Sequence, residues 1–349
     1  MKILLLTLLS FFGVFILFFL WASYPWQLSA LSRNDEIKNG PVSSQSAPSA
    51  LNVLTWNISY AYGIGSEGGE DYQKQSPQHF EANLSAIAET INRFESDVVF
   101  IQEIDFFAAR THFQDQLEFL RQKTNLKNSA RVLSWEANYI PHPLAQWGDH
   151  FGKVSSGGGI LSRWPVLENK VYLLDKPDSK AWWYNLFYLY RYIQIVTLDV
   201  VGKKIKIANL HLEAFDYNNK SEQAKFLLQL LALEKIDMLA GDFNTLPLDA
   251  LKRSGFANPA DDYEYDKTPK LLEKLPLKEV VDPTHYKMNE AQWFTFPSIN
   301  PDRRLDYIYY SAEWNLLKTQ IIYPSRPEVS DHLPVSASFK LFDPEFIRD

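Results

Sequence analysis

The sequence predicts an α/β protein in which two stacked sheets carry helices on their outer faces. Two observations lead to this fold class. From Leu51 onward, short apolar segments alternate with a few amphipathic helical patterns. In addition, no internal repeat and no second linker divides this part of the chain. The pattern therefore favours one large domain over residues 50–349, a size that a sandwich tolerates.

An apolar run opens the chain. The segment from Ile3 to Ala22 contains almost only apolar residues, and about 20 helical residues match a hydrocarbon core of about 30 Å. Trp21 and Tyr24 stand at its end, where aromatic rings favour the membrane–water interface. Residues 1–24 are therefore predicted to be a membrane anchor or a signal segment.

Of these two alternatives, an uncleaved anchor is favoured. The apolar core of a signal peptide normally has about 7–15 residues, and no small-x-small cleavage site follows Ala22. Lys2 precedes the run, whereas Arg33 and Lys38 lie well after it beside acidic residues. This charge bias favours a single-pass membrane protein whose domain lies on the outer, periplasmic or extracellular, side. Secretion after signal cleavage is the alternative.

A linker is predicted next, over residues 25–49. Residues 32–49 are rich in serine, proline, asparagine and glycine. Such a composition is typical of a flexible chain. We therefore expect a tether between the membrane and the domain.

Within the domain, apolar segments predict seven strands: Asn52–Ile58, Asp97–Ile101, Gly159–Ser162, Tyr192–Val200, Lys204–Leu210, Asp237–Ala240 and Leu305–Tyr310. A helix is predicted after Ser76-Pro77, because serine caps helices and proline is favoured at the first helical position. A second helix is predicted from Gln223 to Glu234, and a hairpin turn at Val201-Gly202.

Composition excludes several classes of site. The chain has no cysteine, which excludes disulfides, cysteine zinc sites and thiol nucleophiles. Its net charge of −7 argues against a protein that coats nucleic acid through broad positive charge. A nuclease is still compatible with this charge, because it needs only a local basic patch.

Polar residues of distinctive types stand where the apolar segments end. The set consists of Asn57, Glu103, His211, Asp242, Asn244, Asp306, Asp331 and His332. Because each residue follows or ends an apolar run, its side chain is expected at a sheet rim. Segments far apart in the sequence thus offer carboxylates, amides and imidazoles at equivalent places.

This set suits the cleavage of a phosphate ester. Mg²⁺ prefers oxygen ligands and keeps several waters, so one or two carboxylates suffice. Glu103 is the best candidate ligand, with Asn57 and Asp331 as helpers. Mn²⁺ is the alternative ion.

The remaining residues supply hydrogen-bond donors and a base. Asn244 and His211 can donate to the oxygens of a pentacovalent phosphorus. His332 is the natural base for a water nucleophile, and Asp306 could fix its tautomer.

The chain resembles the endonuclease/exonuclease/phosphatase superfamily from about Leu51 to Lys340. Seven pieces carry the resemblance in the family's order: TWNI, the glutamate of QEI, GGGILSRWPV, NLHLE, GDFN, TFP before RRLDYIYY, and SDHLPV. The resemblance implies a deoxyribonuclease-I-like four-layer α/β sandwich with two packed, mainly antiparallel sheets. It also implies a metal-dependent phosphoric ester hydrolase that cleaves a phosphodiester by attack of water.

The resemblance implies a role for each site residue. Asn57 and Glu103 match the metal-site positions, and Asp331 matches a metal-side carboxylate. Asp242 and Asn244 match the pair that orients or activates water and holds the phosphate.

Three further residues match the phosphate side of the family's site. His211 matches a position that contacts the scissile phosphate. Asp306 and His332 match the orienting acid and the histidine of a dyad. We take His332 as the base, with Asp242 as the alternative.

Each of these residues also has a structural interpretation. His211, taken singly, could be a hydrogen-bonded core histidine, and Asp306 could pair with Arg303 or Arg304. Asp242 could be a turn former. All these interpretations would have to hold at once, which favours the catalytic one.

The substrate is less closely specified. Ala181–Tyr192 contains seven aromatic residues, which could bind lipid headgroups, stack nucleobases or cover the core. The tryptophan–cysteine element of inositol-polyphosphate 5-phosphatases is replaced by Pro301–Arg304. The predicted tether favours a phospholipid-like substrate. A nuclease acting on DNA or RNA is the alternative, and a catalytically silent binding module is a third hypothesis.

Overall fold

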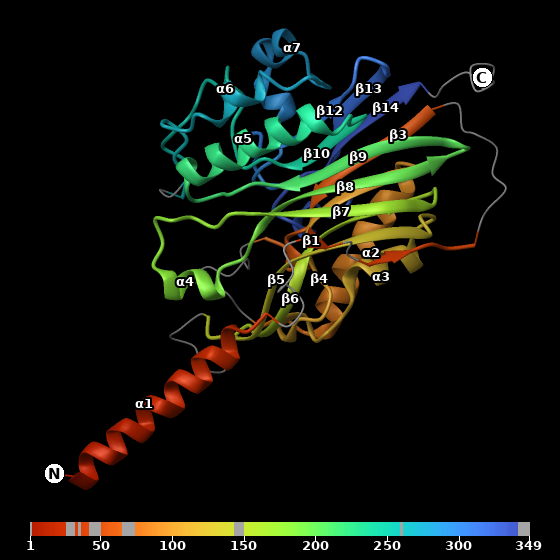
Figure 1. Ribbon diagram of the computed structural model, residues 1–349. Helices are drawn as coiled ribbons and strands as arrows, with labels where there is room; N and C mark the ends of the chain where they lie inside the picture. Colours follow the sequence, from red (N-terminus) through yellow and green to blue (C-terminus); the bar gives the residue numbers. More distant parts are fainter. Residues whose placement is uncertain are drawn as a thin grey trace.

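The computed structural model describes residues 2–25, 32–33, 36–41, 50–64, 74–142, 150–258 and 261–340. In these residues, two seven-stranded sheets pack face to face and helices cover their outer faces (Figure 1). The predicted α/β sandwich is therefore confirmed. Two pairs of neighbouring strands are parallel and the other pairs are antiparallel, which also confirms the mainly antiparallel sheets.

The first sheet has the strand order β13-β14-β3-β4-β6-β5-β2. Its strands are β13 (Asn315–Ile321), β14 (Val335–Lys340), β3 (Ala50–Asn57), β4 (Val98–Asp105), β6 (Gly152–Ser162), β5 (Asn128–Ile140) and β2 (Ile37–Lys38). The parallel pair β3–β4 lies at its centre, so the carboxyl ends of both strands meet at one edge.

The second sheet has the strand order β1-β7-β8-β9-β10-β12-β11. Its strands are β1 (Ser32–Arg33), β7 (Val166–Leu174), β8 (Arg191–Val200), β9 (Lys203–His211), β10 (Met238–Asp242), β12 (Asp306–Tyr310) and β11 (Lys278–Glu279). Here β9 and β10 form the parallel pair. All seven predicted strands are present. The strands β5, β7, β13 and β14 are additional to the predicted set, although the sequence of β14 alternates apolar and polar residues.

The α-helices are α1 (Lys2–Ser23), α2 (Pro77–Arg93), α3 (Gln116–Lys123), α4 (Trp182–Phe187), α5 (Tyr217–Leu233), α6 (Thr268–Leu272) and α7 (Pro283–Met288). As predicted, Ser76 caps α2 and accepts a hydrogen bond from the His79 N–H. The second predicted helix begins earlier than expected. Asp216 accepts a hydrogen bond from the Asn219 N–H, and this cap adds a polar first turn before Gln223.

The hydrophobic core fills three interfaces between four layers. Phe100 and Ile207 belong to the cluster between the two sheets. Phe80 of α2 packs with residues of β3 and β4 on the outer face of the first sheet. Leu227 of α5 packs in the same way on the second sheet. Burial of these side chains stabilises each by about 1.5–3 kcal/mol relative to exposure.

Gly158 in β6 marks a close approach of the two sheets. A Cβ at this position would lie 1.9 Å from the Tyr192 hydroxyl oxygen and 2.8 Å from the Ile101 carbonyl oxygen. The glycine run at residues 157–159 thus lies inside a strand and serves backbone packing rather than a phosphate loop.

The N-terminal helix α1 is long and apolar enough to cross a membrane, with a mean hydropathy of 2.9. Part of the predicted linker is described. There, β1 pairs with β7 and β2 pairs with β5. Residues 26–31, 34–35 and 42–49 lie outside the described residues, so the predicted linker bounds stay a prediction.

Candidate active site

Three site residues lie in one row across the second sheet. Asp242 at the end of β10 is in register with His211 at the end of β9 and with Asp306 at the start of β12. The row exists because β9 and β10 run parallel while β12 runs antiparallel to them. All three side chains are buried. The sheet therefore gathers an imidazole and two carboxylates at a single edge.

The first sheet contributes Asn57 and Glu103 at the corresponding edge. Asn57 ends β3 and is paired with Gln102 of β4. Glu103 follows at a β-bulge, where the pairing of β4 with β6 shifts between Gln102 and Ile104. Its φ of 53° lies in the left-handed region, which costs about 1–2 kcal/mol for a residue with a side chain. Bulges of this kind redirect a side chain beside active sites.

Direct contacts join the two sheets at this edge. The Asn57 Nδ2 donates to Asp242 Oδ2 at 3.1 Å. The His211 Nε2 lies 3.4 Å from the same oxygen and 3.7 Å from Glu103 Oε1. Asp242 is thus the central acceptor of the site, and it contacts residues from both sheets.

His332 and Asp306 lie within hydrogen-bond distance of each other. His332 Nδ1 lies 2.8 Å from Asp306 Oδ2, and both side chains are buried. The Nε2 atom points toward Asp242, 3.8 Å from Oδ2. The alternative pairing of Asp306 with an arginine is wrong, because the Arg303 and Arg304 side chains form ion pairs with other carboxylates.

The backbone around His332 is fixed by hydrogen bonds. Trp56 Nε1 donates to the His332 carbonyl at 2.9 Å. The His332 N–H donates to Ser330 Oγ at 3.1 Å, and this hydroxyl donates to the Asn57 carbonyl at 2.7 Å. The loop that carries the imidazole is therefore tied to the end of β3.

Asp331 and Asn244 lie at the border of the cluster. Asp331 precedes His332, is 7% exposed, and lies 3.5 Å from Ser330 Oγ through its Oδ1. The Asn244 N–H donates to Asp242 Oδ1 at 2.8 Å, and the Asn244 Nδ2 donates to the Leu212 carbonyl at 3.0 Å. Asn244 thus orients Asp242.

Burial shifts the protonation of the central groups in opposite directions. Burial raises the pKa of Asp242 to about 6, against the effect of the nearby His332. Burial also lowers the pKa of His211 well below its ordinary value, and Arg191 adds to this effect. Burial also lowers the pKa of His332. The carboxylates of Asp306, Asp331 and Asp242 outweigh this effect, so the pKa of His332 is raised well above its ordinary value.

The donor set fits a hard divalent cation. Asp242, Asp306 and His332 each offer one ligand atom, and these atoms lie within 4.8 Å of one another. The Asp306 Oδ1 is buried without a hydrogen-bond partner. Glu103 and Asn57 add a carboxylate and an amide beside Asp242. Oxygen-rich donors of this kind are the ligands that Mg²⁺ prefers.

Arg191, Glu213 and Tyr188 are part of the site although the sequence patterns do not indicate them. Arg191 Nη1 lies 2.5 Å from His211 Nε2. Arg191 Nε lies 3.7 Å from Glu213 Oε2, and Glu213 Oε1 accepts a hydrogen bond from the Tyr188 hydroxyl at 2.8 Å. In the sequence, the one indication that Arg191 belongs to the site is its position at the start of β8, the strand that pairs with the strand of His211.

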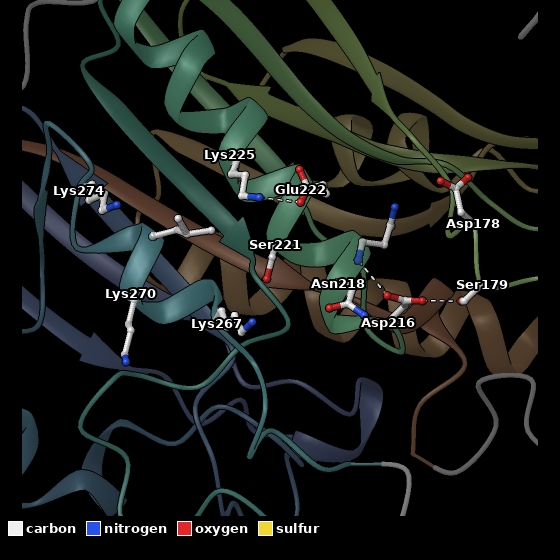
Figure 2. A pocket seen from close by; sticks show the side chains of 12 residues that line it. Asp178, Ser179, Asp216, Asn218, Ser221, Glu222, Lys225, Lys267, Lys270 and Lys274 are labelled. Carbon is white, nitrogen blue, oxygen red and sulfur yellow. Dashed lines mark hydrogen bonds and ion pairs between the residues drawn. The ribbon is translucent and has the colours of Figure 1, made fainter.

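A separate hollow of about 790 Å³ lies between α5 and α6 (Figure 2). Asp216 and Ser221 line it on one side, and Lys267, Lys270 and Lys274 line it on the other. None of the clustered site residues lines this hollow. The candidate active site is therefore defined by the contacts between side chains and not by this hollow.

Solved structures from several organisms share this fold. An endonuclease/exonuclease/phosphatase from Beutenbergia cavernae DSM 12333 is 21% identical, with a TM-score of 0.59 over 84% of this chain and 72% of the other. The human nocturnin catalytic domain is 20% identical, with a TM-score of 0.52 over 90% and 98%. A mannosyl-6-phosphatase from Bacteroides thetaiotaomicron VPI-5482 is 15% identical, with a TM-score of 0.51 over 84% and 100%.

No curated protein sequence matches the chain. The model of the endonuclease/exonuclease/phosphatase family matches residues 54–332, which extend from β3 to the histidine of the dyad. This match covers most of the chain and includes every site residue described above. The chain belongs to the endonuclease/exonuclease/phosphatase family.

Proposed function

We propose that this protein is a membrane-tethered, Mg²⁺-dependent phosphodiesterase that cleaves its substrate by attack of water. The observation that carries the proposal is the row of His211, Asp242 and Asp306 on one sheet edge, with His332 bonded to Asp306. A buried cluster of carboxylates and imidazoles can bind a cation, hold a phosphate and transfer a proton. A structural role alone does not require this combination.

Proton transfer is assigned to His332 and Asp242. Asp306 accepts the hydrogen bond from His332 Nδ1 and so fixes the tautomer and the ring orientation. The Nε2 is left to exchange a proton with the reacting water, and Asp242 Oδ2 is 3.8 Å away. We retain His332 as the base, acting after it has lost the proton that its raised pKa favours, with Asp242, whose pKa is about 6, as the alternative.

Glu103 and Asn57, with Asp331 as a helper, are proposed to hold the cation. Mg²⁺, or Mn²⁺ as the alternative, would polarise the phosphate and lower the pKa of the attacking water. Glu103 is suited to this role because the bulge directs it toward the edge where Asp242 lies. Its carboxylate is also the most exposed of the group, with 18% of the side chain accessible.

His211 and Asn244 are proposed to hold the phosphate. His211 is neutral by virtue of its lowered pKa, and the buried guanidinium of Arg191 beside it supplies positive charge. Donors that are fixed before the reaction stabilise a transition state without reorganisation. Asn244 fixes Asp242 through its backbone N–H.

A phospholipid-like substrate is favoured because of α1. A tether raises the effective concentration of the active site near the bilayer. Nucleic acid is the alternative substrate within the same chemistry. The tether adds nothing to the affinity for a dissolved polynucleotide.

Parallel assays with the full-length protein in detergent test this proposal. Phospholipid vesicles and supercoiled plasmid would each be incubated with Mg²⁺ and with EDTA. Release of a phosphorylated headgroup that EDTA stops is the expected result. Plasmid nicking without headgroup release would instead make the protein a tethered nuclease. If neither the phospholipid nor the plasmid is cleaved with Mg²⁺ or Mn²⁺, a catalytically silent binding module would be favoured.

A further inference from the structure

The short helix α4 exposes an unusual amount of aromatic surface. Trp182 is 74% exposed and Trp183 is 52% exposed, and none of the six residues of α4 is buried. Tyr184 and Leu186 extend the same surface. Large apolar patches on a soluble surface indicate a partner. The interpretation that Ala181–Tyr192 covers the core therefore holds for its second half, where Phe187 and Tyr190 pack against the first sheet's cluster and Tyr192 is buried.

The last turn of α1 packs against α4. The ring of Phe19 lies 5.1 Å from that of Phe187 and 6.4 Å from that of Trp182, both in edge-to-face geometry. Asn138 at the end of β5 donates to the Trp21 carbonyl at 2.8 Å. Figure 1 shows α4 beside the end of α1 that enters the domain. The exposed aromatic surface is therefore continuous with the end of the apolar helix.

We propose that α4 is a membrane-docking element that rests in the headgroup region of the bilayer that α1 spans. This inference rests on the proposed anchoring by α1. If α1 crosses the hydrocarbon core, its last turn lies at the interface, and α4 lies at the same depth. Trp and Tyr are the residues that favour this depth. Lys180, with its Nζ 5.8 Å from the Tyr184 ring, adds a cation for lipid phosphates.

A chain of contacts leads from α4 to the active site. Tyr188 follows α4 directly and donates to Glu213, which lies beside Arg191, the neighbour of His211. All four residues lie at the end of the sheet where β9 terminates. With α4 docked, the catalytic edge would lie on the side of the domain next to the bilayer, and the substrate class would be one whose phosphate lies at headgroup depth.

The absence of cysteine allows a direct test in the full-length protein. Trp183→Cys would introduce one thiol for an environment-sensitive fluorophore. Leu233→Cys is the matched control, because Leu233 is 85% exposed and ends α5. The next residue, Glu234, pairs with Lys206, away from His211. Each labelled protein would be reconstituted into vesicles of phosphatidylcholine and phosphatidylglycerol that carry a nitroxide at headgroup depth.

The expected result is quenching at position 183 that exceeds quenching at position 233 several-fold. Equal quenching at the two positions would overturn the proposal. A fluorescence change at position 183 on addition of single-stranded DNA, without quenching by the lipid nitroxide, would also overturn it and would assign the surface to nucleobases. Because the readout is depth and not turnover, it is independent of whether the proposed reaction occurs.

A second measurement connects docking to substrate use. In Trp182→Ser/Trp183→Ser, the ratio of phospholipid turnover in vesicles to turnover of a soluble phosphodiester should fall about tenfold. Leu233→Ser/Leu251→Ser removes apolar surface elsewhere and should leave this ratio unchanged. An unchanged ratio in the tryptophan variant would contradict docking. Absence of turnover in the unaltered protein would count against the proposed function alone.

Discussion

Asp242 and Asp306 are direct partners across the antiparallel strands β10 and β12, and both side chains are almost fully buried. Two carboxylates so placed repel one another unless a cation or a proton lies nearby. His332 can supply this proton, because its Nδ1 lies within hydrogen-bond distance of Asp306 and its Nε2 faces Asp242. The edge of the second sheet thus places the His332 imidazole between two buried carboxylates.

Replacement of Asp306 tests whether its carboxylate orients the His332 imidazole for catalysis. In Asp306→Asn the imidazole loses its fixed tautomer, and kcat toward a soluble phosphodiester should fall about 10²–10⁴-fold. The thermal midpoint should fall as well, because His332 loses the buried carboxylate that raises its pKa, so kcat is measured below the midpoint, where the variant is folded. Asp302→Asn is the control, since Asp302 lies in the same region but pairs with Arg303. A kcat within twofold of the unaltered protein would contradict the dyad.

Arg191 is expected to act through His211. Arg191→Met leaves Glu213 buried without its cation, which should lower the free energy of unfolding by about 3–5 kcal/mol. In Arg191→Met/Glu213→Gln the buried charge is removed as well, and much of this stability should return. Activity should stay at least about tenfold low in both variants, because His211 still lacks the guanidinium. Recovery of both activity and stability in the double variant would assign Arg191 a purely structural role.

Glu103 should determine metal affinity. Glu103→Gln removes the charge that favours a divalent cation, and Mg²⁺ binding measured by calorimetry should weaken at least about tenfold. Turnover should be lost in EDTA and return at a higher Mg²⁺ concentration than in the unaltered protein. Glu264→Gln changes an exposed carboxylate and serves as the control. Equal Mg²⁺ affinity in the two variants would argue against Glu103 as a ligand.

Gly158 should not tolerate a side chain. A Cβ would overlap the Tyr192 hydroxyl and approach the Ile101 carbonyl, so Gly158→Ala should destabilise the fold by about 1–3 kcal/mol. Denaturant unfolding measures this change. Tyr192→Phe in the same chain removes the nearest oxygen and should restore part of the loss. An alanine variant as stable as the unaltered protein would mean that the sheets are less closely packed here.

Much of the site could be predicted because its residues end regular strands. His211, Asp242 and Asp306 follow or begin strong apolar runs, and parallel or antiparallel pairing then places them in one row. The short strands β1 and β2 could not be predicted, because two residues carry no periodic pattern. They lie in a segment whose composition indicates a linker.

The contact between Arg191 and His211 could not be predicted from strand patterns. The strand of Arg191 is evident from the sequence, but only the packing of the two sheets determines that its guanidinium reaches His211. Likewise, the bulge at Glu103 depends on the register of β4 against β6, which an apolar pattern does not specify. The packing of α4 against α1 joins Phe19 and Phe187, which are 168 residues apart, and no local pattern reveals such a contact.

The turnover of His332→Asn shows whether the His332 imidazole transfers the proton. Asparagine can keep the hydrogen bond to Asp306 in place of Nδ1 but has no atom equivalent to Nε2. We expect the variant to unfold near the temperature of the unaltered protein and to hydrolyse a phosphodiester about 10²–10⁴-fold more slowly with Mg²⁺. Turnover within twofold of the unaltered protein would contradict the assignment of the proton transfer to His332.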